Sequence, residues 1–358
     1  MSWTVVGQDA AITALSAAVA RDRIAHAYLF AGPEHTGKTL TALQFAQRLN
    51  CTGEQPPCGR CRQCEHVASM THADVEIVGI GSPLCDPRPG EPPHDHSKDD
   101  SRDIRICQVR RLERVVSRAP FEGRHRVMII EPAAAMNEAA ANALLKTLEE
   151  PPDGVVLILI TDREEMLLPT IRSRARRIGF AGQPPALIER TLRTRWDVGP
   201  EQAAELARMS GGHIGWAVVA MHDKSLLEQR REALDVAQSM TSAPLSERFA
   251  WAAEVGGRYT RDRGAVQATL EVWQAWWRDI LLIAAGRDLL AVHSDRLDTL
   301  RPLAAQCDVR RAVRALRAIA DARVQLTENA TPVLALEMMT LALPRLQPNA
   351  VSGRLAAR

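Results

Sequence analysis

Residues 28–39 read YLFAGPEHTGKT, a short apolar run followed by the pattern G-x-x-x-x-G-K-T. The apolar run Tyr28–Ala31 predicts a buried strand, and a helix is predicted over about 38–49. Glycines in such a loop let successive backbone N–H groups surround an anion at the helix N-terminus. Lys38 supplies positive charge for the terminal phosphates, and the Thr39 hydroxyl supplies a ligand for Mg²⁺. A plain glycine-rich turn would not explain Lys-Thr here, so the stretch predicts a nucleotide-binding phosphate loop. The predicted nucleotide-contacting residues of the loop are Gly32, Thr36, Gly37, Lys38 and Thr39.

Further apolar runs, separated by helical patterns, surround this loop in the sequence. The predicted strands are Tyr28–Ala31, Val75–Val78, Val127–Ile130, Val155–Ile160 and Ile178–Phe180. Strands that alternate with helices predict a mostly parallel sheet with helices on both faces. Beyond residue 182 no strand is predicted, only helical periods interrupted by Gly and Pro. The predicted fold class is therefore an α/β domain followed by all-α domains.

The change from alternating strands and helices to helices alone suggests where the domains begin and end. We expect a nucleotide-binding domain over 1–180, with a cysteine module at 51–64 and a flexible insertion at 81–103. A small helical domain over 181–242, a larger one over 243–345 and a tail over 346–358 would follow. The insertion is rich in Pro, Asp and Gly, so it is predicted to be a mobile surface loop. Its His94, His96, Asp99 and Asp100 could form an accidental metal site, but solvated loop polarity is the preferred interpretation.

Composition and charge exclude several classes of protein. A hydrophobic content of 46% over 358 residues is enough for more than one buried core, which argues against a disordered chain. Lys and Arg number 45 against 43 Asp and Glu, so any contact with DNA must be local or shared with partners. The N-terminus does not resemble a secretory signal, and no apolar stretch reaches membrane-spanning length. A cytoplasmic protein without a membrane partner is expected.

Four of the seven cysteines lie just after the predicted phosphate-loop helix, at positions 51, 58, 61 and 64. In a reducing compartment such a cluster indicates metal binding and not disulfides. Four thiolates can complete a tetrahedral Zn²⁺ site without an open position, so structural zinc is the preferred interpretation. An iron–sulfur cluster is an alternative, although the fourth cysteine of a ferredoxin-type run would fall at Ala68. Uncoordinated thiols are the third. The predicted zinc ligands are Cys51, Cys58, Cys61 and Cys64, and the ordinary thiols are Cys85, Cys107 and Cys307.

The apolar run Val127–Ile130 ends in Glu131 and Pro132. Hydrolysis of a nucleotide needs one group that holds the metal and another that positions and deprotonates the attacking water. Glu131 offers a carboxylate, but Pro132 cannot accept a proton. We therefore predict that ATP or ADP binds with Mg²⁺ and is not hydrolysed. Thr161, just after another apolar run, is a candidate phosphate sensor, although a polar residue that simply ends a strand is the commoner explanation.

Several short sequence motifs along the chain resemble those of one protein family. They are VGQ (6–8), HAYLF (26–30), the phosphate loop, the four cysteines, NALLKTLEEPP (142–152) and IRSR (171–174). In this order, over roughly residues 3–217, they resemble the bacterial DNA polymerase III clamp-loader family. The resemblance implies an AAA+ fold with a zinc module, a three-helix lid and a C-terminal collar through which five subunits assemble. Such a pentamer opens a ring-shaped sliding clamp and closes it around primed DNA.

Two classes of subunit compete within this family, the ATP-hydrolysing gamma/tau motor and the delta-prime stator. Motor subunits carry an Asp-Glu pair where Glu131 and Pro132 stand, and a phosphate-sensing Arg in the lid where Gly215 stands. Both departures favour the stator, with gamma/tau and delta subunits, the clamp and primed DNA as implied partners. The phosphate loop, often eroded in delta-prime proteins, is intact, so the gamma/tau-type ATPase remains the alternative.

Arg174 is the residue to which the resemblance assigns a chemical role. It follows Ser173 in a segment similar to the Ser-Arg-Cys motif of clamp loaders, with Ala175 in place of the Cys. Family precedent makes this Arg a finger that reaches the ATP site of the neighbouring motor subunit. The other arginines of the segment are interpreted as a solvated basic edge, and they are Arg172, Arg176 and Arg177.

Two helices are predicted with particular detail. Asn137 is expected to cap a helix that runs to Glu150, before two prolines. In the C-terminal part, Trp273, Trp276 and Trp277 recur at helical spacing with Ile280. Burial in a core or a subunit contact is the preferred explanation, and an aromatic platform for single-stranded DNA is the alternative.

Overall fold

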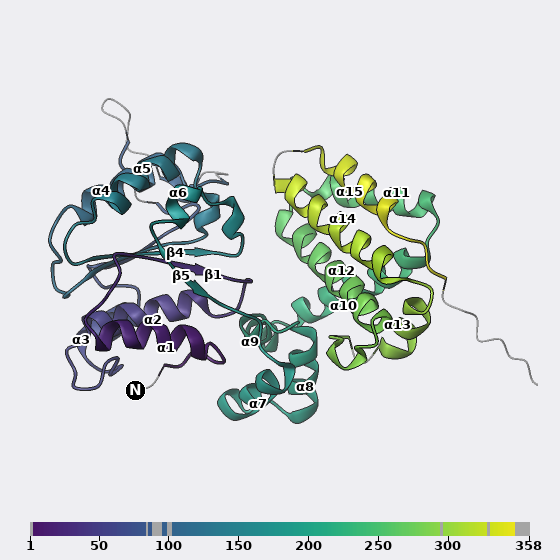
Figure 1. The fold of residues 1–358 in the computed structure, drawn as a ribbon, viewed down its shortest axis with the longest axis horizontal. Coiled ribbons are helices and arrows are strands. Elements are labelled where there is room, and N and C mark those ends of the chain that lie inside the picture. Colours follow the sequence, from purple (N-terminus) through teal and green to yellow (C-terminus); the bar gives the residue numbers. More distant parts are fainter. Residues whose placement is uncertain are drawn as a thin grey trace, which may run out of the picture. The chain divides into compact units, whose positions relative to one another are not determined.

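The computed structural model describes residues 3–83, 85–87, 95–98, 102–293, 296–327 and 330–347. The chain divides into two compact units (Figure 1). The first comprises residues 1–187 and 212–215, and the second comprises residues 188–211 and 216–358. Among the described residues, no helix is both long and apolar enough to cross a membrane.

A parallel sheet of five strands forms the centre of the first unit, in the order β2-β3-β4-β1-β5. Alternate side chains point to opposite faces, so Tyr28 and Phe30 join one core while Leu29 joins the other. The predicted parallel sheet is confirmed. The last strand begins two residues before its predicted start, because the edge position lets the exposed Arg176 and Arg177 extend it. The strands are β1 (Ala27–Ala31), β2 (Val75–Val78), β3 (Arg126–Ile130), β4 (Val155–Thr161) and β5 (Arg176–Gly179).

Helices cover both faces of this sheet and complete a three-layer arrangement (Figure 1). One face carries α1 (Asp9–Ala20), α2 (Lys38–Asn50) and α3 (Arg62–Ala68), and the other carries α4 (Ile106–Val116), α5 (Glu138–Glu149) and α6 (Pro169–Arg172). Short 3-10 turns lie at His96–Lys98, Ala133–Ala135 and Glu164–Met166. The predicted cap of α5 is confirmed, because the Asn137 side chain accepts a hydrogen bond from the Ala140 N–H at 2.9 Å.

After β5, the described residues form helices and their connections but no strand, as predicted. These helices are α7 (Pro185–Trp196), α8 (Pro200–Met209), α9 (Ile214–His222), α10 (Lys224–Ser242), α11 (Leu245–Arg258), α12 (Arg263–Ala284), α13 (Leu297–Ala304), α14 (Val309–Thr327) and α15 (Pro332–Ala342), with a 3-10 turn at Asp288–Leu290. The first residues of α7 and α9 belong to the first unit, and the other helices belong to the second. The division of this part of the chain into a lid over 181–242 and a collar over 243–345 stays a prediction.

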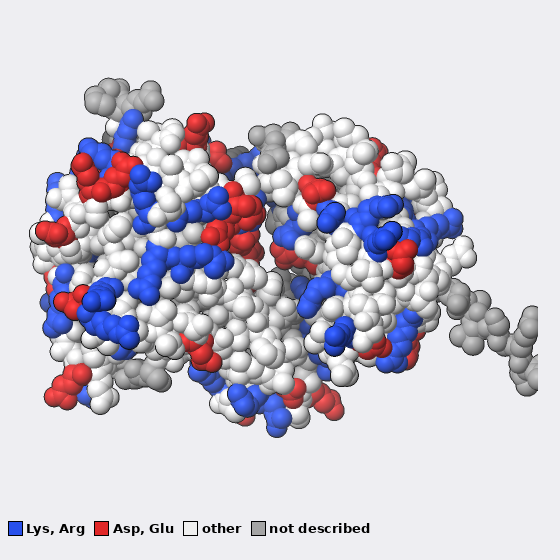
Figure 2. Space-filling model, viewed as in Figure 1, with Lys and Arg blue, Asp and Glu red and all other residues white. Residues whose placement is uncertain are grey.

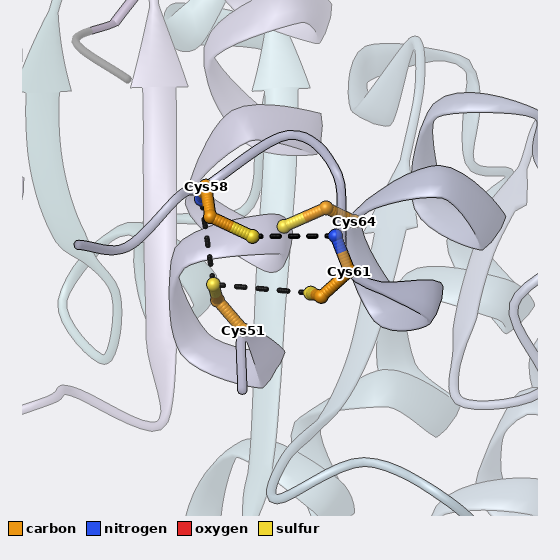
Figure 3. Close-up of side chains that lie close together, drawn as sticks. All are labelled: Cys51, Cys58, Cys61 and Cys64. Atoms are coloured by element: carbon orange, nitrogen blue, oxygen red, sulfur yellow. Dashed lines mark hydrogen bonds between the residues drawn. The ribbon is translucent and has the colours of Figure 1, made fainter. Parts of the chain in front are cut away.

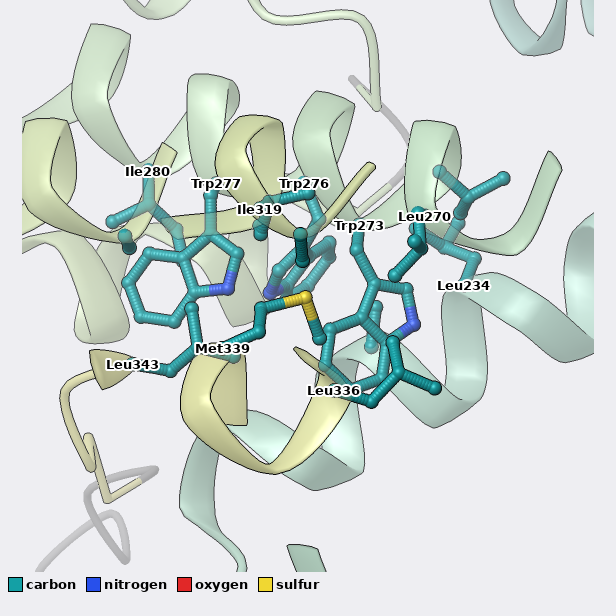
Figure 4. Close-up of a cluster of buried hydrophobic side chains, with 14 of the residues drawn as sticks. Leu234, Leu270, Trp273, Trp276, Trp277, Ile280, Ile319, Leu336, Met339 and Leu343 are labelled. Carbon is teal, nitrogen blue, oxygen red and sulfur yellow. The ribbon is translucent and has the colours of Figure 1, made fainter. Parts of the chain in front are cut away.

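The tryptophans of α12 lie inside the core of the second unit (Figure 4). Trp273, Trp276 and Trp277 are each no more than 1% exposed, which confirms burial and excludes an exposed stacking platform at these positions. The Trp276 indole N–H donates to the Thr241 hydroxyl at 3.0 Å. Leu346 also belongs to this core, so packing continues at least one residue past the expected end of the collar.

The predicted flexible insertion at 81–103 is described only in part. His94, Asp99 and Asp100 lie outside the described residues. His96 begins a 3-10 turn and is 1% exposed. Its interpretation as solvated loop polarity was therefore wrong, because the side chain packs against the buried Cys107.

Candidate nucleotide-binding and metal sites

The phosphate loop joins β1 to α2, and its glycines are required by its shape. Gly32 has φ of +153°, and a Cβ atom there would lie 2.2 Å from the carbonyl oxygen of Phe180. Gly37 adopts a left-handed conformation with φ of +92° immediately before α2. The first N–H groups of α2 have no partner within the helix, so the loop places a turn of backbone donors beside a helix N-terminus.

Lys38 folds back over this loop. Its Nζ donates to the carbonyl oxygens of Gly32 at 2.7 Å and Pro33 at 2.6 Å. Burial lowers the pKa of Lys38, and the charges of Asp162, Glu131 and Glu34 oppose that shift. A terminal phosphate would give the ammonium group a charged acceptor in place of two neutral carbonyls. The effect of Asp162 on Lys38 depends on the fold, so it could not be predicted from the sequence.

Thr39 and Glu131 meet at the carboxyl end of the sheet. The Thr39 Oγ1 lies 2.7 Å and 2.8 Å from the two carboxylate oxygens of Glu131. A hydroxyl and a carboxylate are the oxygen donors that Mg²⁺ accepts beside nucleotide phosphates. Pro132 follows Glu131 and contributes no proton acceptor. The structure thus brings together the two predicted metal ligands, without a general base at position 132.

Two further predicted residues also lie at the loop. Thr161 ends β4 in register with Ala31, and its carbonyl oxygen accepts the Gly32 N–H at 3.2 Å. The Thr161 hydroxyl accepts a hydrogen bond from the Arg163 N–H at 3.0 Å, so its phosphate-sensing role stays a prediction. Thr36 is buried, and its hydroxyl donates to the Pro33 carbonyl at 2.8 Å. Thr36 therefore stabilises the conformation of the loop through a hydrogen bond inside it.

Gln8 positions the phosphate loop, a role that was not predicted from the sequence. Its side-chain amide donates to the carbonyl oxygens of Thr36 at 3.1 Å and Ala181 at 2.8 Å. These bonds tie the phosphate loop to the segment after β5. The only signal in the sequence was the position of Gln8 in the VGQ motif (6–8). A single glutamine gives no pattern that predicts this contact.

Gly215 lies directly against the phosphate loop. Its N–H donates to the His35 carbonyl oxygen at 2.8 Å. A Cβ atom on Gly215 would lie 2.9 Å from that oxygen and 3.3 Å from the His35 Cα. A longer side chain does not fit here unless the backbone moves. The position at which the resemblance expects a sensing Arg in motor subunits is therefore a tight backbone contact in this chain.

The four predicted zinc ligands form one compact cluster (Figure 3). Their sulfur atoms all lie within 4.8 Å of one another. Cys51 directly follows α2 and Cys61 directly precedes α3, so the ends of two helices hold the cluster. The Cys51 and Cys61 sulfurs are 3.9 Å apart. A tetrahedral ion with Zn–S bonds of about 2.3 Å places its sulfurs about 3.8 Å apart, so the cluster fits Zn²⁺.

Backbone donors surround these sulfurs. The N–H groups of Gly53 and Cys58 point at the Cys51 sulfur at 3.3 Å and 3.4 Å, and the Cys61 N–H points at the Cys58 sulfur at 3.3 Å. Burial raises the pKa of Cys61, but N–H donors from Cys64 and Thr52 outweigh it and lower this pKa to about 6. Burial raises the pKa of Cys64 to about 12. A bound cation would favour the thiolate form of both cysteines.

Arg174 lies at the surface just after α6. One guanidinium nitrogen pairs with the Glu149 carboxylate at 2.8 Å, and another donates to the Thr170 carbonyl oxygen at 3.0 Å. Arg177 pairs separately with Glu164 at 2.7 Å, while Arg172 and Arg176 are exposed. Three of the four arginines are therefore exposed, whereas Arg174 is half-buried and forms a solvent-accessible ion pair with Glu149.

Comparisons with known proteins identify subunits of DNA polymerase III as relatives of this chain. The family model for the DNA polymerase III delta subunit matches residues 7–184. The delta-prime subunit of Bacillus subtilis is 26% identical over 96% of this chain and 98% of its own length. The delta-prime subunit of Pseudomonas aeruginosa is 36% identical over 64% of this chain and 70% of its own length. The gamma/tau subunit of Mycobacterium tuberculosis H37Rv is 31% identical over 80% of this chain but only 42% of its own length. A solved gamma-subunit-related protein of Thermotoga maritima covers 92% of this chain and 98% of its own, with 16% identity and a TM-score of 0.40.

The strand order, the phosphate loop after β1 and the carboxylate after β3 define a P-loop protein of the AAA+ class. The relatives identify the kind of subunit within this class, since the chain covers 98% and 70% of the two delta-prime subunits but only 42% of the gamma/tau subunit. The chain belongs to the delta-prime family of DNA polymerase III clamp-loader subunits.

Proposed function

We propose that this chain is the stator of a clamp loader, which supports ATP-dependent opening of the sliding clamp and its loading onto primed DNA. Its partners would be gamma/tau and delta subunits in a hetero-pentamer that works in the cytoplasm. The observation that carries this proposal is a complete phosphate loop beside Pro132, which cannot act as a base. The backbone contact of Gly215 with His35 supports it further.

The proposed cofactors follow from the two sites. Lys38, Thr39 and Glu131 would hold ATP or ADP with Mg²⁺, bound and not hydrolysed. The four cysteines would hold one structural Zn²⁺, which supplies a rigid tetrahedral link between α2 and α3. Positive and negative side chains are mixed on the face shown in Figure 2, consistent with DNA contacts shared among subunits.

The zinc assignment is tested by elemental analysis of the full chain. Cys61→Ser should lower the zinc content by about one ion per chain, because three sulfurs no longer close the site. Cys307→Ser is the matched control, since Cys307 belongs to the core of the second unit and the cluster belongs to the first. An unchanged zinc content in Cys61→Ser, or iron in place of zinc, contradicts the assignment.

Arg174 is the residue we propose to act on another subunit's ATP. A finger in trans must be accessible, and Arg174 lies at the surface with Glu149 as its ionic partner. Such exposed pairs contribute at most about 1 kcal/mol, so the charged phosphates of a neighbouring site can replace Glu149. The guanidinium would then stabilise the charge that develops as the terminal phosphoryl group is transferred.

The test uses the reconstituted pentamer and not the isolated chain. Arg174→Ala should leave assembly intact and reduce hydrolysis at the adjacent motor site by roughly 10³–10⁵-fold, so total clamp- and DNA-stimulated ATPase falls by that site's share. Arg174→Lys should restore little, because an ammonium lacks the planar fork of guanidinium. Arg177→Ala, which removes another exposed arginine, serves as control. Full ATPase and clamp loading by an assembled Arg174→Ala complex would rule out the finger.

A further inference from the structure

A second group of metal-binding side chains lies in the first unit, separate from the four-cysteine cluster. Cys85, His96 and Cys107 come from three different segments, and their ligand atoms lie within 4.8 Å of one another. The His96 Nε2 is 3.1 Å from the Cys107 sulfur. His96 and Cys107 are buried, and Cys85 is half-buried. From the sequence alone, both cysteines are predicted to be ordinary thiols.

Contacts of the backbone bring these segments together. The Asp86 N–H donates to the carbonyl oxygen of Cys107 at 2.9 Å, which fixes the residue after Cys85 against the first turn of α4. The Asp86 carboxylate also pairs with Arg114 of α4 at 2.9 Å. The Ser97 N–H donates to the Asp95 carboxylate at 2.9 Å within the turn that carries His96. The backbone and the carboxylate of Asp86 thus hold the segment of Cys85 against α4 without any contribution from a metal.

The chemistry of the donor set indicates one metal above others. Two thiolates and an imidazole are soft to intermediate ligands, which suit Zn²⁺ and not the oxygen-preferring Mg²⁺ or Ca²⁺. Bonds of about 2.3 Å to sulfur and about 2.0 Å to nitrogen place tetrahedral sulfur and nitrogen ligands roughly 3.6 Å apart. The His96 Nε2 and Cys107 Sγ atoms, at 3.1 Å, would need to separate by only about half an ångström.

We propose that Cys85, His96 and Cys107 bind a second Zn²⁺ ion. Among the described residues the group provides three protein ligands, so the fourth position is left for water or another donor. A disulfide between Cys85 and Cys107 would not require His96.

The location of this site indicates what the ion does. The segment that carries Cys85 leaves β2 at Gly79, where a Cβ atom would lie 2.6 Å from the carbonyl oxygen of Glu131. Gln108, next to Cys107 on α4, donates to the Gly79 carbonyl at 3.0 Å. The second zinc therefore ties the β2–α4 connection to the helix beside the nucleotide-binding edge of the sheet.

Zinc stoichiometry of the full-length chain, purified under reducing conditions, tests the proposal. Cys85→Ser should reduce the zinc content by one ion per chain relative to wild type, whereas Cys307→Ser should leave it unchanged. Cys85 is only half-buried, so this variant keeps most packing intact, and circular dichroism checks its fold. His96→Gln should lose the same ion and should not add to Cys85→Ser. A double variant of Cys61 and Cys85 to Ser should lose two ions.

The result can be separated from failure at the four-cysteine cluster, because each variant reports one site. Cobalt substitution adds a spectral check, since the Co²⁺ lost in Cys85→Ser should show weaker sulfur-to-metal absorption than a four-thiolate site. Equal zinc in wild type and in folded Cys85→Ser overturns the proposal. A Cys85–Cys107 disulfide in the protein purified under reducing conditions, detected by mass spectrometry, also overturns it.

Discussion

Lys38 in the phosphate loop and Arg248 in the second unit are both buried cations that donate to backbone carbonyl oxygens. Lys38 is 6% exposed and donates to two such oxygens, and Arg248 is 2% exposed and donates to four. Burial and hydrogen bonds alone therefore do not separate a ligand-binding cation from a structural one.

The surroundings of the two cations differ in charge. The acidic residues Asp162, Glu131 and Glu34 act on Lys38 and oppose the lowering of its pKa by burial. Burial also lowers the pKa of Arg248, and the charge of Arg345 lowers it further. Arg248 bonds carbonyls near the ends of α10 and α15, where helices leave acceptors unpaired. Lys38 instead stands beside a second polar pair, Thr39 and Glu131, that can share a ligand.

The largest expected effect on stability follows from replacing Arg248, the structural cation of the two. Arg248→Met should lower the free energy of unfolding of the second unit by about 4 kcal/mol, because four carbonyl oxygens, three of them in buried hydrogen bonds, lose their donor. Urea unfolding followed by tryptophan fluorescence measures it, since Trp273 and Trp276 lie in the same unit. Arg258→Met is the control, because that exposed α11 arginine forms only an i,i+4 pair. Equal stability of the two variants would refute the role of Arg248.

The buried carboxylate of Asp74 in the first unit extends the comparison to a negative charge. Asp74 accepts hydrogen bonds from the N–H groups of Phe121, Glu122 and Gly123 and pairs with Arg126 at 2.7 Å. Asp74→Asn should cost about 3 kcal/mol at neutral pH, because Arg126 is left without its buried partner. Amide hydrogen exchange of β3 measures this loss within the first unit.

The same residue predicts a dependence on pH. Burial raises the pKa of Asp74, but the three N–H donors and Arg126 outweigh it, so the folded pKa lies below the usual value. Its stabilising contribution is present above about pH 4 and is lost as the pH falls through the lowered pKa. The difference between wild type and Asp74→Asn should shrink in that range. Asp153→Asn, at an exposed carboxylate, should show neither effect.

The smallest expected effect on stability concerns Lys38. Lys38→Met should change the free energy of unfolding by less than about 1 kcal/mol, since the loss of two hydrogen bonds is offset by removal of a desolvated charge. Nucleotide affinity should fall roughly 10–100-fold, the worth of a hydrogen bond to a charged group. Titration with a fluorescent nucleotide measures this, and Lys146→Met on the exposed face of α5 is the control.

ATP hydrolysis by the same two proteins is measured as phosphate release. Wild type and Lys38→Met should both show no turnover of ATP, because Pro132 provides no base. Sustained hydrolysis by the isolated wild-type chain that Lys38→Met abolishes would contradict the stator and favour the gamma/tau-type motor.

The sequence by itself determined the features that depend on local pattern. Apolar runs located β1 to β4 because a buried strand needs consecutive apolar residues, and Gly32 and Gly37 marked the phosphate loop because the backbone turns sharply there. The four-cysteine cluster was predictable because ligands separated by six, two and two intervening residues can meet without help from the rest of the chain. The helical spacing of the α12 tryptophans likewise predicted their burial.

Tertiary structure decided the features that join distant residues. Gln8 reaches Ala181 across 173 positions, and Gly215 contacts His35 only because the chain returns to the loop. Cys85, His96 and Cys107 meet because the sheet places the end of β2 beside α4, and the sequence carries no spacing rule for such a meeting. The roles of Lys38 and Arg248 diverge for the same physical reason: each side chain's electrostatic surroundings are built from residues far away in the sequence.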